Sequence, residues 1–350
     1  MTGANIRKLT VAALVLSAWW HAAGAQQQAP SLPVHLRDTG LYAPGQGTQI
    51  DPRNLPFSPQ YPLWSDGAVK RRWIYLPPGT AIDAANADAW DFPRGTRLWK
   101  EFSLDRPVET RFIERLADGT WRFGTYIWNE EGTDATLAPA GGIASLPARG
   151  APREGYAVPS EFDCRACHEG AAAPVLGFSA LQLSADRDPL APHTDARSGI
   201  DLKELVARGL VKNLPPALID AQPRIAANSP VERAALGYLH GNCGHCHNRN
   251  GAPVPVDLTL AQSAVDGADG VERVLRSMIA DGRFRAHGAS STQLVAPGQP
   301  EASLLVTRVR SRNPQTQMPP IGTRLIDTEA LVLIERWIKE KSSTEEELKP

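Results

Sequence analysis

All four cysteines of this 350-residue chain occur in two copies of one five-residue pattern. The first copy is Cys164-Arg165-Ala166-Cys167-His168 and the second is Cys243-Gly244-His245-Cys246-His247. Two thiols three positions apart can reach the two vinyl groups on one edge of a haem, and the adjacent imidazole then lies under the iron. The pattern therefore predicts two covalently bound haem c groups, with Cys164, Cys167, Cys243 and Cys246 as attachment sites and His168 and His247 as proximal iron ligands.

Two other chemistries use paired cysteines. Paired C-x-x-C motifs bind zinc in many proteins, but there the pairs are separated by about 15 to 20 residues, whereas here they begin at residues 164 and 243. Exported proteins also use disulfides and redox-active dithiols. Neither zinc nor disulfide chemistry requires a histidine after each pair, so covalent haem attachment is the preferred interpretation.

Met318 is the predicted second axial ligand of the second haem. The chain has three methionines including the initiator, and Met318 follows the second motif in the proline-rich segment Gln317-Met318-Pro319-Pro320. A thioether is a common axial ligand of electron-transfer haems. The alternative is a methionine that fills a gap in the core.

The sixth ligand of the first haem is left open by the sequence. No methionine lies between Cys164 and residue 240, and His193 is the nearest unassigned histidine on the C-terminal side. Weaker candidates are His240, His287 and Met278, and we expect His245 to face solvent from within the attachment loop. An iron with protein ligands on both sides suits electron transfer, whereas an open position lets peroxide or another small molecule bind.

The first 25 residues read as an export signal. Arg7 and Lys8 precede an apolar stretch from Leu9 to Trp20, and Ala23-Gly24-Ala25 fits a cleavage site. The apolar stretch is shorter than the roughly 20 residues that span a bilayer, so we predict a periplasmic or secreted protein with no stable membrane span after cleavage. Residues 26–32 form an expected flexible lead-in that begins with three glutamines.

Residues 33–158 have the composition of a β-rich domain. Short aromatic and β-branched runs at 71–76, 96–104, 109–116 and 120–128 alternate with proline, glycine and aspartate. Asp118-Gly119 suits a tight hairpin turn between the last two runs. The prediction is an antiparallel β domain, expected to be a sandwich, whose tryptophans serve as core more readily than as a binding platform.

The rest of the chain changes to a helical pattern. We expect residues 159–223 to form the first haem-attachment segment. In residues 224–342, a helix is predicted to begin at Ser229-Pro230-Val231-Glu232, to have one apolar face and to end at Gly241. Asp327 is the predicted cap of a last helix buried through Ala330, Ile334, Trp337 and Ile338. Residues 343–350 are expected to be a frayed tail. The predicted fold class is therefore a multidomain α+β protein, with an α-helical c-type haem region after the β domain.

The charge excludes one class of partner. Lys and Arg number 37 against 38 Asp and Glu, so the chain lacks the basic excess with which proteins neutralise nucleic-acid phosphates. We expect no nucleic-acid partner.

Two resemblances add to these predictions. Residues 224–342 resemble a class I cytochrome c domain, through the helix leading into the second motif, the Gly251-Ala252-Pro253 loop, the Met318 loop and the closing helix with Trp337. That resemblance implies that the Pro253 carbonyl receives the N–H of His247. Over its wider length the chain is similar to a family of exported bacterial di-haem proteins, through Tyr61 to Gly67, Glu109 to Phe112, Pro159 to Asp163 and Leu176-Gly177-Phe178.

Three functions are compatible with this pattern. The first is electron transfer between the two haems and a periplasmic electron donor or acceptor protein. The second is a di-haem peroxidase with an open first haem, where Arg165 or Glu169 could act on bound peroxide. The third makes the β domain a binding module served by the haems.

Overall fold

The computed structural model describes residues 31–194, 199–250, 257–279 and 293–346, with side chains to residue 341. The predicted export signal and most of the lead-in lie outside these residues. The chain divides into two units, Met1–Leu32 and Pro33–Pro350, and the second is described below.

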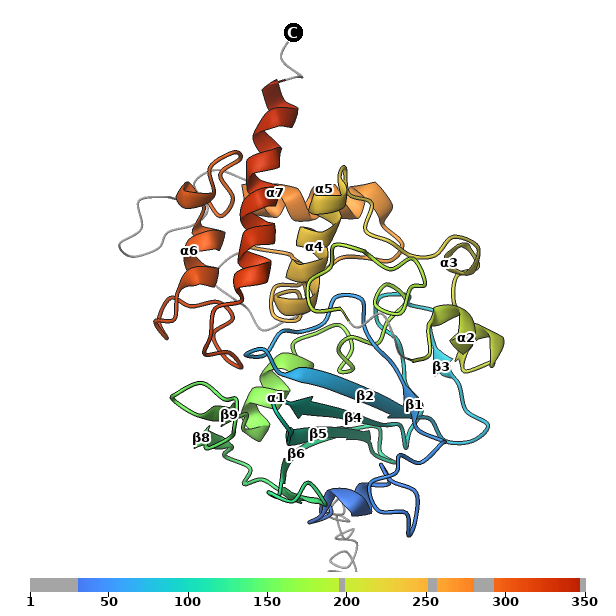
Figure 1. Cartoon of the computed structure of the whole chain (residues 1–350). Coiled ribbons are helices and arrows are strands. Elements are labelled where there is room, and N and C mark those ends of the chain that lie inside the picture. Colours follow the sequence, from blue (N-terminus) through green and yellow to red (C-terminus); the bar gives the residue numbers. More distant parts are fainter. Residues whose placement is uncertain (1–30, 195–198, 251–256, 280–292, 347–350) are drawn as a thin grey trace, which may run out of the picture. The chain divides into compact units, whose positions relative to one another are not determined.

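An antiparallel sheet of six strands forms the first half of this unit (Figure 1). Its order is β1-β2-β4-β5-β6-β7, made by β1 (Leu55–Pro56), β2 (Val69–Tyr75), β4 (Arg97–Ser103), β5 (Pro107–Arg115), β6 (Trp121–Trp128) and β7 (Ala135–Leu137). The four predicted runs are therefore strands β2, β4, β5 and β6. The β5–β6 hairpin closes where predicted, since Gly119 has a φ of 94° and the Leu116 N–H donates to the Thr120 carbonyl over 2.8 Å.

The expected sandwich of two packed sheets is wrong for the described residues. Besides the large sheet they form two two-stranded sheets, β8 (Ile143–Leu146) with β9 (Tyr156–Val158) and β3 (Ile82–Asp83) with β10 (Val211–Lys212). One face of the large sheet is instead covered by apolar residues from later in the chain, including Phe178, Leu202 and Leu205. The strand pattern predicted a buried face but not the element that buries it.

Helices make up the second half of the unit, and Figure 1 shows α4 to α7 gathered beyond one side of the sheet. The α-helices are α1 (Glu161–His168), α2 (Leu202–Ala207), α3 (Ala217–Asp220), α4 (Pro230–Asn242), α5 (Gly267–Ile279), α6 (Leu304–Arg310) and α7 (Thr328–Glu346), with 3₁₀ turns η1 (Leu36–Thr39) and η2 (Pro300–Ala302). Ser229 caps α4 by accepting from the Glu232 N–H, and Asp327 caps α7 by accepting from the Ala330 N–H, as predicted. Helix α7 continues to Glu346, into the segment that we expected to fray.

Gly241 does not end helix α4, which continues to Asn242. A Cβ atom at Gly241 would lie 2.3 Å from the Tyr61 carbonyl oxygen, and one at Gly237 would lie 2.0 Å from the Tyr61 ring. These glycines let the segment before β2 approach the helix backbone. Asn242 completes the contact, because its Oδ1 accepts from the Trp64 N–H over 2.8 Å.

The two largest hydrophobic cores among the described residues each touch one cysteine motif. The sheet core contains Ile74, Leu98, Ile113 and Phe123 and packs against Cys164. The helical core contains residues of α4, α5, α6 and α7 and packs against Cys243. The two motifs are therefore carried by different cores.

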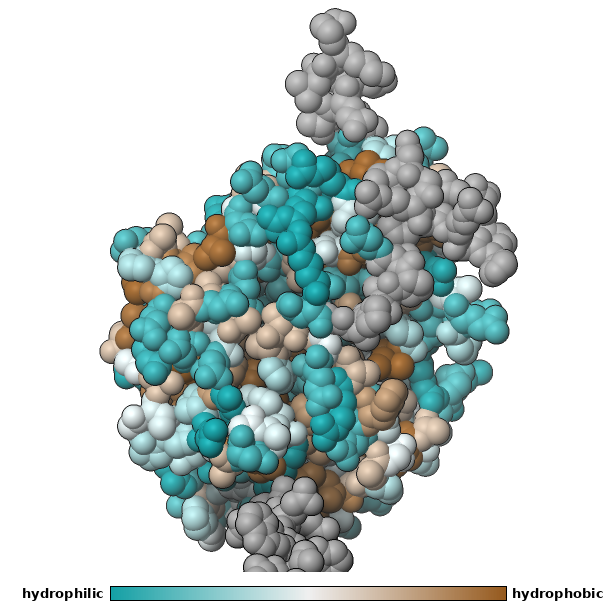
Figure 2. Space-filling view, turned by 180° about the vertical axis from the view of Figure 1, so that it is seen from behind, coloured by the Kyte–Doolittle hydropathy of each residue, from teal (hydrophilic) through white to brown (hydrophobic). Residues whose placement is uncertain are grey.

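Among the described residues, no helix combines the length and the apolar character that a membrane crossing requires. On the face drawn in Figure 2, hydrophobic residues lie in small groups between hydrophilic ones.

Candidate haem site

Helix α1 positions the first motif. Ser160 caps it by accepting from the Asp163 N–H over 3.1 Å, and the Asp163 carboxylate accepts in return from the Ser160 N–H over 2.9 Å. This reciprocal pair fixes the start of the helix. Cys164 and Cys167 then lie one turn apart on the same side of the helix, which is the arrangement that two thioether bonds to one haem edge require.

His168, the last residue of α1, is held as a neutral imidazole. Its Nδ1 lies 2.6 Å from the Pro174 carbonyl oxygen, and its ring lies 5.3 Å from that of Phe123. Burial lowers the pKa of His168 to about 4, so the ring is neutral near pH 7. With the Nδ1–H donated to Pro174, the Nε2 lone pair is available to an iron.

The second motif follows directly on α4. The Cys243 N–H donates to the Leu239 carbonyl and the His247 N–H donates to the Cys243 carbonyl, both over 2.9 Å, so the helix ends in a tight loop. Burial lowers the pKa of His247. Its Nδ1 is buried without a hydrogen-bond partner in the described residues, and Pro253, the expected acceptor, lies outside them.

The two motifs meet in space. The Asn248 side-chain amide donates to the carbonyl oxygens of Gly170 and Gly244 over 2.9 Å and of His245 over 3.0 Å, which ties the turn after one motif to the other motif. The thiols of Cys167 and Cys246 also interact, and this contact together with burial raises the pKa of Cys167 to about 12. The attachment edges of two haems would therefore lie close together.

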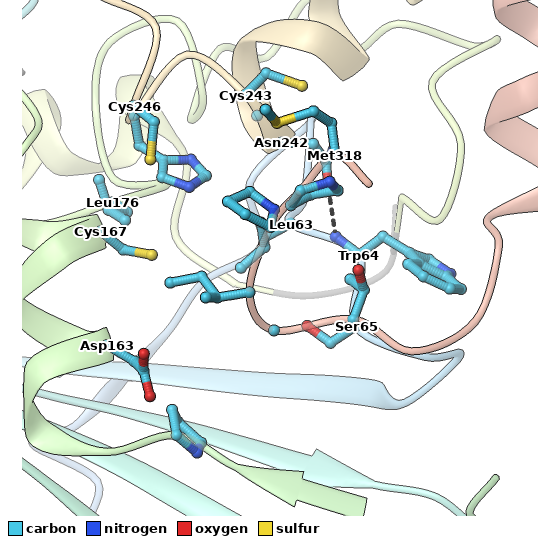
Figure 3. Close-up of a pocket in the computed structure, with 18 of the residues that line it drawn as sticks. Leu63, Trp64, Ser65, Asp163, Cys167, Leu176, Asn242, Cys243, Cys246 and Met318 are labelled. Atoms are coloured by element: carbon cyan, nitrogen blue, oxygen red, sulfur yellow. Dashed lines mark hydrogen bonds between the residues drawn. The ribbon is translucent and has the colours of Figure 1, made fainter. Parts of the chain in front are cut away.

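A cavity of about 1180 Å³ opens between the motifs. All four cysteines, His168, His247 and Met318 line it, and Figure 3 shows Met318 beside Cys243 and Cys167 facing the same space as Cys246. Pockets that bind one small-molecule ligand have volumes of about 300 to 1,000 Å³, so this cavity is larger than one such ligand requires. The thiols, the neutral imidazoles and the apolar lining fit haem groups.

The structure does not bring His193 together with the other predicted site residues. Its Nε2 lies 2.9 Å from both carboxylate oxygens of Asp327, and its Nδ1 lies 3.4 Å from Glu329. His193 is also not among the residues that line the cavity. Its imidazole is therefore held by carboxylates at the start of α7.

The weaker candidates lie in several places. His240 accepts from the Gln262 N–H over 3.1 Å through its Nδ1, and Met278 is fully buried in the helical core. His287 lies outside the described residues. His245 was expected to face solvent, but it lines the cavity and interacts with Cys167 because the second motif folds against the first.

The described residues contain no disulfide and no cluster of metal-ligating side chains. There the four cysteines are free thiols, and no three His, Cys, Asp or Glu side chains converge as metal ligands would. Arg165, proposed above to act on peroxide, forms ion pairs with Glu161 and Glu169 along α1.

Sequence reasoning missed Pro174, although a signal was present. Pro174 follows His168 by six positions, and Pro253 follows His247 at the same spacing. Asn248 was also missed, since nothing near it in the sequence indicates that it would reach Gly170.

Comparison with known proteins identifies a c-type cytochrome-like region. Residues 275–322 match a family model described as Planctomycete cytochrome C, a segment that includes Met318 and neither cysteine motif. No curated protein and no solved structure matches the chain. The match agrees with covalently bound haem c.

Proposed function

We propose that this chain is a periplasmic di-haem c-type cytochrome that passes electrons between its two haems and a redox partner protein. The observation that carries the proposal is that both motifs open into one cavity, with Cys167 beside Cys246. A short path between the two attachment edges favours electron exchange within the molecule.

Each side chain has a defined part in this proposal. Haem supplies the one-electron chemistry when bound. The four thiols attach it, His168 and His247 hold the iron as neutral imidazoles, and the Pro174 carbonyl orients the ring of His168. Met318 lines the cavity beside Cys243, where its thioether would complete the second site and raise its potential.

We also propose the class I cytochrome c fold for residues 224–342. In support, α4 and α7 pack together, and the Trp337 indole N–H donates to the Glu232 carboxylate over 3.1 Å. The Met318 segment lies between α6 and α7. The first and last helices of the region thus meet near the second motif.

The test is to count haems and redox couples in protein made in a host that attaches haem c. We expect a mass increment of two haems and two one-electron couples in a redox titration. Cys164→Ala/Cys167→Ala and Cys243→Ala/Cys246→Ala, each made as a double variant, should each retain one haem and one couple. A colourless product, or one that gains no haem mass, would contradict the proposal.

A second candidate is a peroxidase in which the first haem has an open position. It is favoured because few side chains in the described cavity wall could be a sixth ligand of the first haem. Met318 is the one methionine there and is assigned to the second haem, and His245 is the one histidine there besides His168 and His247. Peroxide consumption with a reduced dye distinguishes the candidates. Turnover together with stoichiometric carbon monoxide binding at one haem supports the peroxidase, and their absence supports electron transfer.

A further inference from the structure

A row of basic side chains lies on the sheet face that lines the cavity. In the strand register, Arg72 of β2 lies opposite Lys100 of β4, and Lys100 lies opposite Arg111 of β5. Three basic residues therefore stand side by side on adjacent strands. All three line the cavity. Like charges in direct cross-strand register destabilise a sheet, so the arrangement requires compensation.

The opposite face of the same strands handles its charges differently. There Arg71 pairs with Glu101 over 2.7 Å, and Arg122 pairs with Glu114 over 2.5 Å, each across neighbouring strands. On the cavity face, strands β2, β4 and β5 contribute Lys70, Arg72, Lys100, Arg111 and Arg115 together with one carboxylate, Glu109. On the opposite face of these three strands, Glu101 and Glu114 balance Arg71 and Arg97, so an excess of cations is found on the cavity face.

Internal contacts act on several of these charges. Glu109 is buried and pairs with Arg111 over 2.6 Å, and it also accepts from the Tyr156 hydroxyl over 2.9 Å. The cationic groups of Lys70, Lys100 and Arg111 lie 5.8, 4.9 and 4.2 Å from the centre of the Phe102 ring, so they converge on one place. Burial and the neighbouring guanidinium groups lower the pKa of Lys70 to about 7 and that of Lys100 well below its usual range.

The position of the row relates it to the first motif. Helix α1 packs against β6, Phe123 of β6 contacts His168, and Arg111 interacts electrostatically with Cys164. The row therefore begins beside the motif at Arg111 and leads away from it across β5, β4 and β2. Two strand spacings separate Arg111 from Arg72, about 10 Å. This is close to the distance from the vinyl edge of a porphyrin to its carboxylate edge.

We propose that this basic row binds the propionate carboxylates of the first haem, which then lies over the sheet with its thioether edge at α1. This inference rests on the proposed function. A propionate carboxylate beside Arg72, Lys100 and Lys70 would form charge-assisted hydrogen bonds with these side chains. A free oxyanion could use the same chemistry, and the test separates the two sources.

The experiment uses Lys100→Gln in the two-haem protein, with Arg71→Gln as the matched control. Both changes remove one basic side chain from neighbouring strands, and Lys100 is charged when a propionate lies beside it, but Arg71 is on the opposite face. Loss of a cation beside a haem favours its oxidised form. We expect Lys100→Gln to lower the reduction equilibrium constant of one haem roughly tenfold, which is 59 mV for a one-electron couple, and to shift a propionate band in the resonance Raman spectrum.

The experiment has three possible outcomes. Each is interpreted only after the unmodified protein has been shown to contain two haems and two redox couples. A shift in one couple and in the propionate band for Lys100→Gln, but not for Arg71→Gln, supports the proposal. Unchanged couples and bands would overturn it while leaving the proposed function intact. Saturable binding of inorganic phosphate to the unmodified protein at constant ionic strength, absent in Lys100→Gln, would show a free-oxyanion site and also overturn it. Arg72→Gln provides a second variant if Lys100→Gln does not fold.

Discussion

Asn248→Ala measures how strongly the two motifs are held together. The Asn248 amide contacts three carbonyl oxygens, one in the turn after the first motif and two in the second motif. A neutral hydrogen bond contributes about 0.5 to 1.5 kcal/mol net, and a buried carbonyl left without a partner costs about 1 to 3 kcal/mol. Because the amide has only two N–H groups and the site is part-buried, we expect a loss of about 2 kcal/mol in the free energy of unfolding.

The assay is guanidinium unfolding of the two-haem protein, followed by tryptophan fluorescence. The midpoint should fall while the dependence of the unfolding free energy on denaturant stays the same. Asn250→Ala is the matched control, since Asn250 is exposed and two positions away.

The separation of the two reduction potentials provides a second measurement on the same samples. If Asn248 holds the attachment edges together, that separation should change in Asn248→Ala and not in Asn250→Ala. Equal midpoints and equal potentials in the two variants would refute the reasoning, because the contact between the motifs would then not depend on this side chain.

Three further predictions follow from the geometry. Met318→Ala should lower the potential of one haem and let carbon monoxide bind there without loss of haem mass; an unchanged spectrum and potential would remove Met318 from the ligands. Gly237→Ala should lower stability by about 1 to 3 kcal/mol through overpacking against Tyr61, measured as a lower melting temperature, whereas Gly141→Ala, with open space at its Cβ, should not. Burial lowers the pKa of His240 to about 4, against about 6.5 in an unfolded chain. Its contribution to stability is therefore complete above about pH 6.5 and is lost as the pH falls towards 4, and His240→Gln should flatten the stability profile measured across that window.

Features that depend on neighbouring residues could be predicted from the sequence. The cysteine spacing indicates haem attachment because the two thiols and the imidazole must fit a single porphyrin. Strands β2, β4, β5 and β6 and the caps at Ser229 and Asp327 were predicted for the same reason, since side-chain alternation and capping hydrogen bonds act over a few positions.

Features that depend on distant residues were decided by the tertiary structure. Gly241 looked like a helix end, and only the approach of Tyr61 reveals its role. The sequence offered His193 as one candidate for an open ligand position, and the fold places it against Asp327. Nothing in the local sequence indicates that a later segment, instead of a second sheet, covers the first one.

The row formed by Arg72, Lys100 and Arg111 illustrates the difference most clearly. Each residue read alone is an ordinary charged position in a strand, and strand register alone places the three side by side. Covalent chemistry and local hydrogen bonds are determined by residues a few positions apart, so a sequence reveals them. The residues that share a cavity wall are determined by packing and pairing between segments far apart in the chain, because burial of apolar surface favours one arrangement of those segments over many others.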